Sequence, residues 1–157
     1  VPVVAAGGIA DGRGLAAALT LGAAGALIGT RFYAAGESLG HANAKARIVA
    51  SSGDQTVRTR VFDIARAIDW PQEYTGRAIA NDFTRRWHGR ESELGQALAA
   101  ERPRYAAAAE AGDVDTAVVW AGEGLDLVRR VEPAASIVER IVAEAGTALE
   151  KATAARL

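Results

Sequence analysis

The chain has 157 residues, 50% of them hydrophobic, and a formal net charge of -1 at pH 7. This length and composition suffice for a globular domain with a buried core, and they exclude collagen-like or disordered sequence. The small net charge gives no electrostatic basis for binding nucleic acid or an anionic membrane, so we expect small-molecule partners. With no cysteine and only 2 histidines, thiolate metal sites are excluded and a histidine-rich site is disfavoured. A metal would have to be bound by carboxylates, and we predict no metal site.

The first 40 residues alternate between short apolar runs and helix-compatible sequence. Val3 to Ala6 is bounded by glycines and is typical of a strand buried on both faces of a parallel sheet. A helix should follow, with Asp11 as its N-cap and Gly22 as its stop. Gly25 to Ile28 has the pattern of a second buried strand. The order of strand, helix, strand and helix predicts two parallel βα units.

Two strands are too few to build a parallel sheet that is buried on both faces. The sequence also begins as though inside a strand, without a leader pattern. We therefore expect the chain to be the C-terminal portion of a longer protein, whose preceding part supplies the missing strands.

Charged and helix-favouring sequence dominates after His41. We expect helices over Ala42 to Ser51, over Arg77 to Gly89 and over Glu91 to Ala111. The second has Ile79, Phe83 and Trp87 at helical intervals, and Pro103 should interrupt the third. The pattern of Val61 to Ile64 is ambiguous between helix and strand. A last helix should begin near Pro133, with Ile137, Ile141, Val142, Ala145 and Leu149 on one face. The division that this pattern predicts is 1–40 for the βα units, 41–115 for a small helical domain and 116–157 for a return segment and C-terminal helix.

Two glycine-rich segments, Gly7-Gly8 and Gly29-Thr30, each follow a predicted strand and lead into a helix. Unpaired main-chain N–H groups at the start of a helix attract an anion, and glycine lets the backbone approach it closely. In (β/α)8 barrels the loops after the last two strands commonly form a phosphate site. We therefore favour phosphate binding over simple tight turns. Arg31 would either pair with that phosphate or form a structural ion pair.

The sequence lacks the motifs of two common classes of phosphate ligand, the nucleoside triphosphates and the dinucleotides. The sequence lacks the G-x-x-x-x-G-K-[ST] loop of nucleoside triphosphate sites, and Gly12-x-Gly14 lacks the third glycine and the following acid of a dinucleotide fingerprint. A mononucleotide is the better prediction.

These segments resemble the phosphate region of the nitronate monooxygenase family, formerly called 2-nitropropane dioxygenases. The resemblance rests on Pro2 to Gly14 and on Gly22 to Phe32, and stretches as far as Trp120-Ala121-Gly122-Glu123 are also similar to bacterial members. It implies the C-terminal part of a (β/α)8 TIM barrel that holds FMN non-covalently, with the last two βα units, an inserted mostly helical small domain and a C-terminal helix packing back on the barrel. It also implies oxidation of alkyl nitronates by molecular oxygen.

The resemblance places six residues at FMN-contacting positions: Gly7, Gly8, Leu27, Ile28, Gly29 and Thr30. Many members carry Gln and Met at the positions of Leu27 and Ile28, so only a main-chain contact to the flavin would survive there. The catalytic histidine of the family lies upstream of the glycine motifs, so the catalytic residues of this chain stay unassigned. We expect His41 to begin a helix and His88 to end one.

Two further residues have two interpretations each. Trp120 either covers the isoalloxazine ring or packs in the core. Glu123 is either a pocket carboxylate or the cap of a backbone turn.

The glycine signatures are shared with flavin-dependent enoyl-acyl carrier protein reductases, which use NAD(P)H, so such a reductase is an alternative enzyme. A non-catalytic βα module that kept its glycines for turns is the alternative outside enzymes. We further expect a cytoplasmic protein that forms a homo-oligomer. We expect it to bind neither nucleic acid nor membrane, because its net charge is small and no apolar run approaches the roughly 20 residues of a spanning helix.

Overall fold

A parallel strand pair with a helix between its strands forms the first part of the chain. In this computed structural model, which describes residues 1–155, β1 (Val4–Ala6) pairs with β2 (Gly25–Leu27), and α1 (Gly12–Thr20) connects them. The Asp11 side chain caps α1 by accepting a hydrogen bond from the Gly14 amide at 3.0 Å. Gly22 ends the helical segment with a φ of +96°, a conformation that favours glycine. The predicted order of elements, the N-cap and the stop are confirmed.

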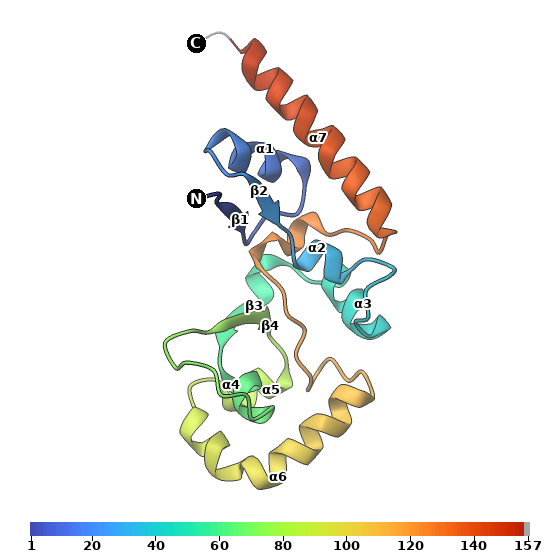
Figure 1. Cartoon of the computed structure of the whole chain (residues 1–157). Helices are drawn as coiled ribbons and strands as arrows, with labels where there is room; N and C mark the ends of the chain where they lie inside the picture. Colours follow the sequence, from blue (N-terminus) through green and yellow to red (C-terminus); the bar gives the residue numbers. More distant parts are fainter. Residues whose placement is uncertain (156–157) are drawn as a thin grey trace.

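The C-terminal helix α7 (Ala134–Ala154) packs along α1, as Figure 1 shows. The two backbones approach closely at Gly12, where a Cβ would lie 2.3 Å from the Glu144 Cβ. Ile137, Ile141 and Ala145 are buried on the predicted face. The prediction for Val142 is wrong, since its side chain is 60% exposed. It follows Ile141 directly and therefore points about 100° away around the helix.

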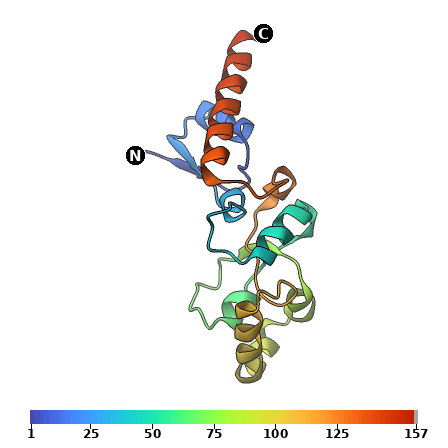
Figure 2. The same ribbon diagram turned by 90° about the vertical axis from the view of Figure 1, so that its right-hand side faces the viewer.

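The middle of the chain forms a lobe of helices around one antiparallel strand pair. Its elements are α3 (Ala42–Ala50), η1 (Gly53–Gln55), β3 (Thr56–Thr59), α4 (Val61–Ala65), β4 (Gly76–Ile79), α5 (Asp82–Trp87) and α6 (Glu91–Glu110). The short α2 (Thr30–Tyr33) precedes them, and the return segment contains the 3-10 turn η2 (Glu123–Leu127). Figures 1 and 2 place α7 and α6 toward opposite ends of the molecule, with α2 and α3 between them.

Two expectations for this lobe need correction. The helix expected over Arg77 to Gly89 is wrong in its first part, because residues up to Ile79 form β4. Helix α5 begins only after Asn81, whose amide and side chain exchange hydrogen bonds with Thr84. Pro103 does not interrupt α6, which runs through it as one curved helix (Figure 1).

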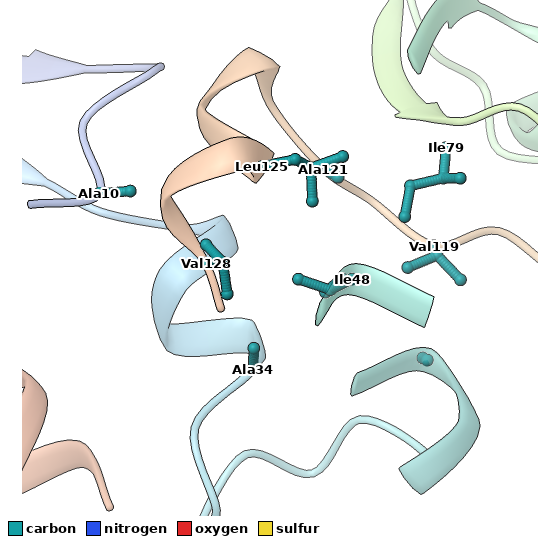
Figure 3. Packing of buried hydrophobic residues seen from close by; sticks show 9 residues of the cluster. Ala10, Ala34, Ile48, Ile79, Val119, Ala121, Leu125 and Val128 are labelled. Carbon is teal, nitrogen blue, oxygen red and sulfur yellow. The ribbon is translucent and has the colours of Figure 1, made fainter. Parts of the chain in front are cut away.

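One buried cluster joins the lobe to the βα units. Figure 3 shows Ala10 and Ala34, from the loops next to β1 and α2, packing in the same cluster as Ile48 of α3 and Leu125 of η2. The cluster also contains Val119 of the return segment, which accepts a main-chain hydrogen bond from Ile79 at 3.0 Å. The lobe is therefore fixed close to the segments that follow β1 and β2.

Candidate functional site

The two glycine-rich segments lie side by side at one edge of the strand pair. Because β1 and β2 run parallel, the loops that follow them leave the sheet at the same edge. Both loops line a single cavity of about 270 Å³. Its walls are residues of the first loop, the second loop and the return segment: Ala6, Gly7, Gly8, Ile9, Ala10, Leu27, Gly29, Thr30, Gly122 and Gly124. No charged side chain is among these lining residues.

The lining offers main-chain donors. Within residues 1–155, the amides of Gly7, Gly8, Gly29 and Thr30 donate no hydrogen bond to another part of the chain. Gly7 and Gly8 have φ values of +98° and +71°, which residues other than glycine rarely adopt. Unpaired N–H groups around one cavity form a site for an anion.

Helix α1 does not contribute its first amides to this cavity. The Gly12 amide donates to the Glu144 carboxylate at 2.9 Å, and the Gly14 amide donates to Asp11. Burial raises the pKa of Asp11, but the hydrogen bonds from Gly14 and Arg13 outweigh it and hold that pKa below its usual value. The donors of the first loop therefore precede the helix, which differs from the helix-start geometry that the sequence suggested.

The return segment closes one side of the cavity. The Gly122 amide donates to the Thr30 hydroxyl oxygen at 2.9 Å, which leaves the hydroxyl proton of Thr30 free to donate elsewhere. At Gly124 a Cβ would lie 2.7 Å from the Gly8 carbonyl oxygen. Sequence reasoning did not assign these two glycines to the cavity. The spacing Gly122-x-Gly124 next to Trp120 was the available signal.

Arg31 forms a structural ion pair, the second of the two alternatives that the sequence left open. Its side chain is 1% exposed, and its Nη2 lies 2.7 Å from a Glu132 carboxylate oxygen. Its Nη1 donates to the Arg130 carbonyl at 2.8 Å. Burial lowers the pKa of Arg31, while the charge of Glu132 opposes that shift.

Glu132 is the centre of this ion-pair network. It also pairs with Arg130 at 2.8 Å and with Arg140 of α7 at 2.6 Å. Burial raises the pKa of Glu132, but the three arginines outweigh burial and hold that pKa below its usual range. The network joins the end of the second loop to α7, and α7 in turn holds the Gly12 amide through Glu144.

Leu27, the last residue of β2, and Ile28, which follows it, lie in different surroundings. Leu27 lines the cavity and is 68% exposed. Ile28 is not among the lining residues and packs instead in the cluster of Ala35, Ile137 and Ile141. The structure therefore brings five of the six predicted residues to one cavity.

A second cavity of about 610 Å³ lies next to the first and shares Gly29, Thr30 and Gly122 with its lining. Trp120 and Arg77 line its other side. Trp120 packs edge-on against Phe62, with ring centroids 6.0 Å apart, so its ring belongs to the core of the lobe.

The remaining candidates serve local structure. Glu123 pairs with Arg77 at 2.8 Å. His41 caps α3 by accepting a hydrogen bond from the Asn43 amide, and His88 ends α5. Neither histidine lines the cavity of the glycine loops. Within residues 1–155, no group of three or more potential metal ligands comes together, and no helix is long and apolar enough to cross a membrane.

The sequence model described as nitronate monooxygenase matches residues 1–144. The chain belongs to the nitronate monooxygenase family. It is 38% identical over 146 residues to nitronate monooxygenase npaC of Metarhizium robertsii, covering 88% of this chain and 40% of that protein. Members of this family and related flavoenzymes are flavin-dependent.

Solved structures of TIM-barrel flavoenzymes show the same fold. The nitroalkane oxidase of Streptomyces ansochromogenes matches with a TM-score of 0.78 and 33% identity, over 98% of this chain and 42% of that one. FabK of Thermotoga maritima matches with a TM-score of 0.77 and 32% identity, over 98% of this chain and 47% of that one. The chain thus spans less than half the length of each of these relatives and corresponds to part of the barrel.

Proposed function

We propose that this chain is the C-terminal part of an FMN-dependent nitronate monooxygenase, and that the cavity between the two glycine loops holds the FMN phosphate. The observation that carries the proposal is the set of unpaired amides of Gly7, Gly8, Gly29 and Thr30 around one cavity of about 270 Å³. A phosphate oxygen accepts hydrogen bonds from such donors without a cationic side chain. Membership of a flavin-dependent family supports a flavin as the ligand.

The residues present fit such a phosphate on two counts. The positive φ of Gly7 and Gly8 and the absence of a Cβ leave their backbone open to the ligand. The Thr30 hydroxyl is held by Gly122, so that its proton is available to the ligand as a further donor. Leu27 would contact the flavin through its main chain. We propose no such contact for Ile28, whose side chain is committed to the cluster on α7.

When bound, FMN supplies the two-electron oxidation of a carbanion-like nitronate and the reaction with molecular oxygen. The part of this chain in the reaction is to bind and orient. The two loops fix the phosphate end, and the second cavity, with Trp120 and Arg77, borders the second of these loops. The base that handles the substrate proton lies outside this chain in our proposal, because neither His41 nor His88 lines the cavity.

The alternative is a flavin-dependent enoyl-acyl carrier protein reductase, and the similarity to FabK is the observation in its favour. The experiment that separates the two is anaerobic mixing of the full-length flavin-loaded protein with NADPH, and separately with ethyl nitronate. We expect flavin bleaching by the nitronate and little bleaching by NADPH alone. Rapid bleaching by NADPH would support the reductase instead.

A non-catalytic βα module is the third reading, and the colour of the protein tests it. We expect the purified full-length protein to be yellow and to release FMN on denaturation. A colourless protein that takes up no FMN would favour the module.

A cytoplasmic location and a homo-oligomeric state remain predictions. Cell fractionation followed by immunoblotting would test the first, and sedimentation velocity of the purified protein would test the second.

A further inference from the structure

The loop between α4 and β4 carries three large apolar side chains that face solvent. Ile68, Trp70 and Tyr74 are 39%, 52% and 58% exposed. Exposing such side chains together on one short loop forfeits the free energy that their burial would provide.

These three side chains line one cavity together with Trp120. Its volume is about 530 Å³, and we call it the aromatic cavity. This volume lies within the range of roughly 300 to 1,000 Å³ that is typical of small-molecule sites, whereas protein partners bind flatter and larger surfaces. Its charged lining residues are Asp63 and Arg66, whose opposite charges leave the lining without net charge. The aromatic cavity therefore favours an uncharged, apolar ligand group.

The backbone that leads into the loop is held in a strained conformation. Ala67 has a φ of +53°, which makes it the one non-glycine residue with positive φ in the described part of the chain. The conformation is fixed by hydrogen bonds from the amides of Ala67 and Ile68 back to α4, at 2.9 Å each. Such strain persists only where surrounding structure enforces it, and the residues that follow, Ile68 and Trp70, both line the aromatic cavity.

Trp120 connects the aromatic cavity to the candidate cofactor site. It also lines the second cavity, next to Gly29 and Thr30. Its ring packs directly on the Gly76 backbone, because a Cβ on Gly76 would lie 2.3 Å from a ring atom and only glycine leaves it room. The residue thus lines both the aromatic cavity and the cavity that borders the second glycine loop.

We propose that the aromatic cavity binds the hydrocarbon part of the substrate, so that the enzyme prefers nitronates with a chain of several carbons over short ones. This inference rests on the proposed function. Trp70 and Tyr74 act as specificity-determining residues that contact the chain, and Trp120 is the wall against which it lies.

The first test is a series of primary alkyl nitronates from two to six carbons, assayed with the full-length enzyme. We expect kcat/KM to rise by up to about fourfold for each added methylene, the factor that corresponds to burying one methylene group. In Trp70→Ala and Tyr74→Ala the slope against chain length should flatten, with a larger loss of kcat/KM for the six-carbon nitronate than for the two-carbon nitronate. Val142→Ala, an exposed apolar truncation on α7, is the matched control and should keep the slope.

A second measurement does not need the flavin reaction. The neutral 1-nitrohexane quenches indole fluorescence, so its binding to the flavin-free full-length protein is followed by tryptophan emission. We expect saturable quenching, with an apparent Kd at least tenfold weaker in Trp70→Ala and unchanged in Val142→Ala.

The outcomes separate this inference from the proposed function. Efficient oxidation of all nitronates with no dependence on chain length, or quenching that ignores Trp70, would overturn the aromatic cavity as a substrate site and leave the proposed function intact. Saturable, Trp70-dependent quenching without any nitronate oxidation would overturn the proposed function and support the cavity. Resistance of Trp70 to acrylamide quenching in the full-length protein would show that another segment covers the loop, and would overturn the inference.

Discussion

Three consecutive residues of the second loop have different tasks. Gly29 leaves its amide open to the cavity, Thr30 accepts the Gly122 amide through its hydroxyl, and Arg31 is buried against Glu132. Arg31, the cationic side chain of this loop, therefore holds the loop in place through its pair with Glu132. In our proposal the phosphate is bound by main-chain dipoles, so the conformation of the loop decides affinity more than nearby charge does.

Substituting Gly29 tests this arrangement. The Gly29 backbone has a φ of -87°, and a Cβ there would meet no atom within 4 Å, so larger residues are compatible with the fold. We expect Gly29→Asp to weaken FMN binding by at least about a hundredfold, because it sets a carboxylate against the phosphate. The measurement is flavin absorbance retained after gel filtration, with far-ultraviolet circular dichroism to report the fold. Gly29→Ala is the control and should keep its helix content. Retained yellow colour in Gly29→Asp would mean that the phosphate lies elsewhere.

At the scale of elements, the expected helix over Arg77 to Gly89 joins buried residues that belong to a strand and a helix. Ile79, Phe83 and Trp87 recur at helical intervals, but Ile79 packs in the cluster that Figure 3 shows, while Phe83 and Trp87 pack in another. Periodicity reports only that a residue is buried, and it does not report against what. The cap at Asn81 is the local signal that separates β4 from α5, because an Asn at this position starts a helix.

The ion-pair network around Glu132 predicts a measurable coupling between α7 and the second loop. Glu132→Gln should destabilise the full-length protein by about 3 kcal/mol, because it leaves the buried Arg31 without its partner charge. Chemical denaturation measures this loss. FMN binding should weaken more than riboflavin binding, since only FMN carries the phosphate that the loop positions. Equal losses for both flavins would show a purely structural role.

The dependence on pH has a defined sign. The folded-state pKa of Glu132 lies below its ordinary value of 4.5, so its contribution is complete above that value. As the pH falls below 4.5 and through the folded-state pKa of Glu132, the stabilisation by its carboxylate disappears. The stabilities of wild type and Glu132→Gln should then converge. Asp115→Asn, which removes the more exposed pair with Arg47, is the control and should cost less than about 1 kcal/mol.

At the scale of the whole molecule, the sequence predicted what is local and missed what is distant. The glycine loops were predicted because each consists of neighbouring residues after an apolar run. The contacts that close the cavity and hold its second loop join residues about a hundred positions apart, namely Thr30 with Gly122 and Arg31 with Glu132. No spacing rule connects such residues, because their proximity depends on where the lobe places the return segment.

The behaviour of residues 1–157 expressed alone is the last prediction. Val3, Val4, Leu21 and Leu27, in and beside the strand pair, are 64%, 57%, 89% and 68% exposed. Open strand edges and apolar surface of this kind favour association, and two of eight barrel units cannot close a barrel. We expect the isolated chain to self-associate and to unfold over a broad range of temperature, as measured by sedimentation velocity and calorimetry. The full-length protein should melt more sharply and bind less of a dye for exposed apolar surface, because the rest of the barrel covers these side chains. A monomeric isolated chain with one sharp, cooperative transition would contradict this, and would mean that the lobe and α7 stabilise the strand pair without the other barrel strands.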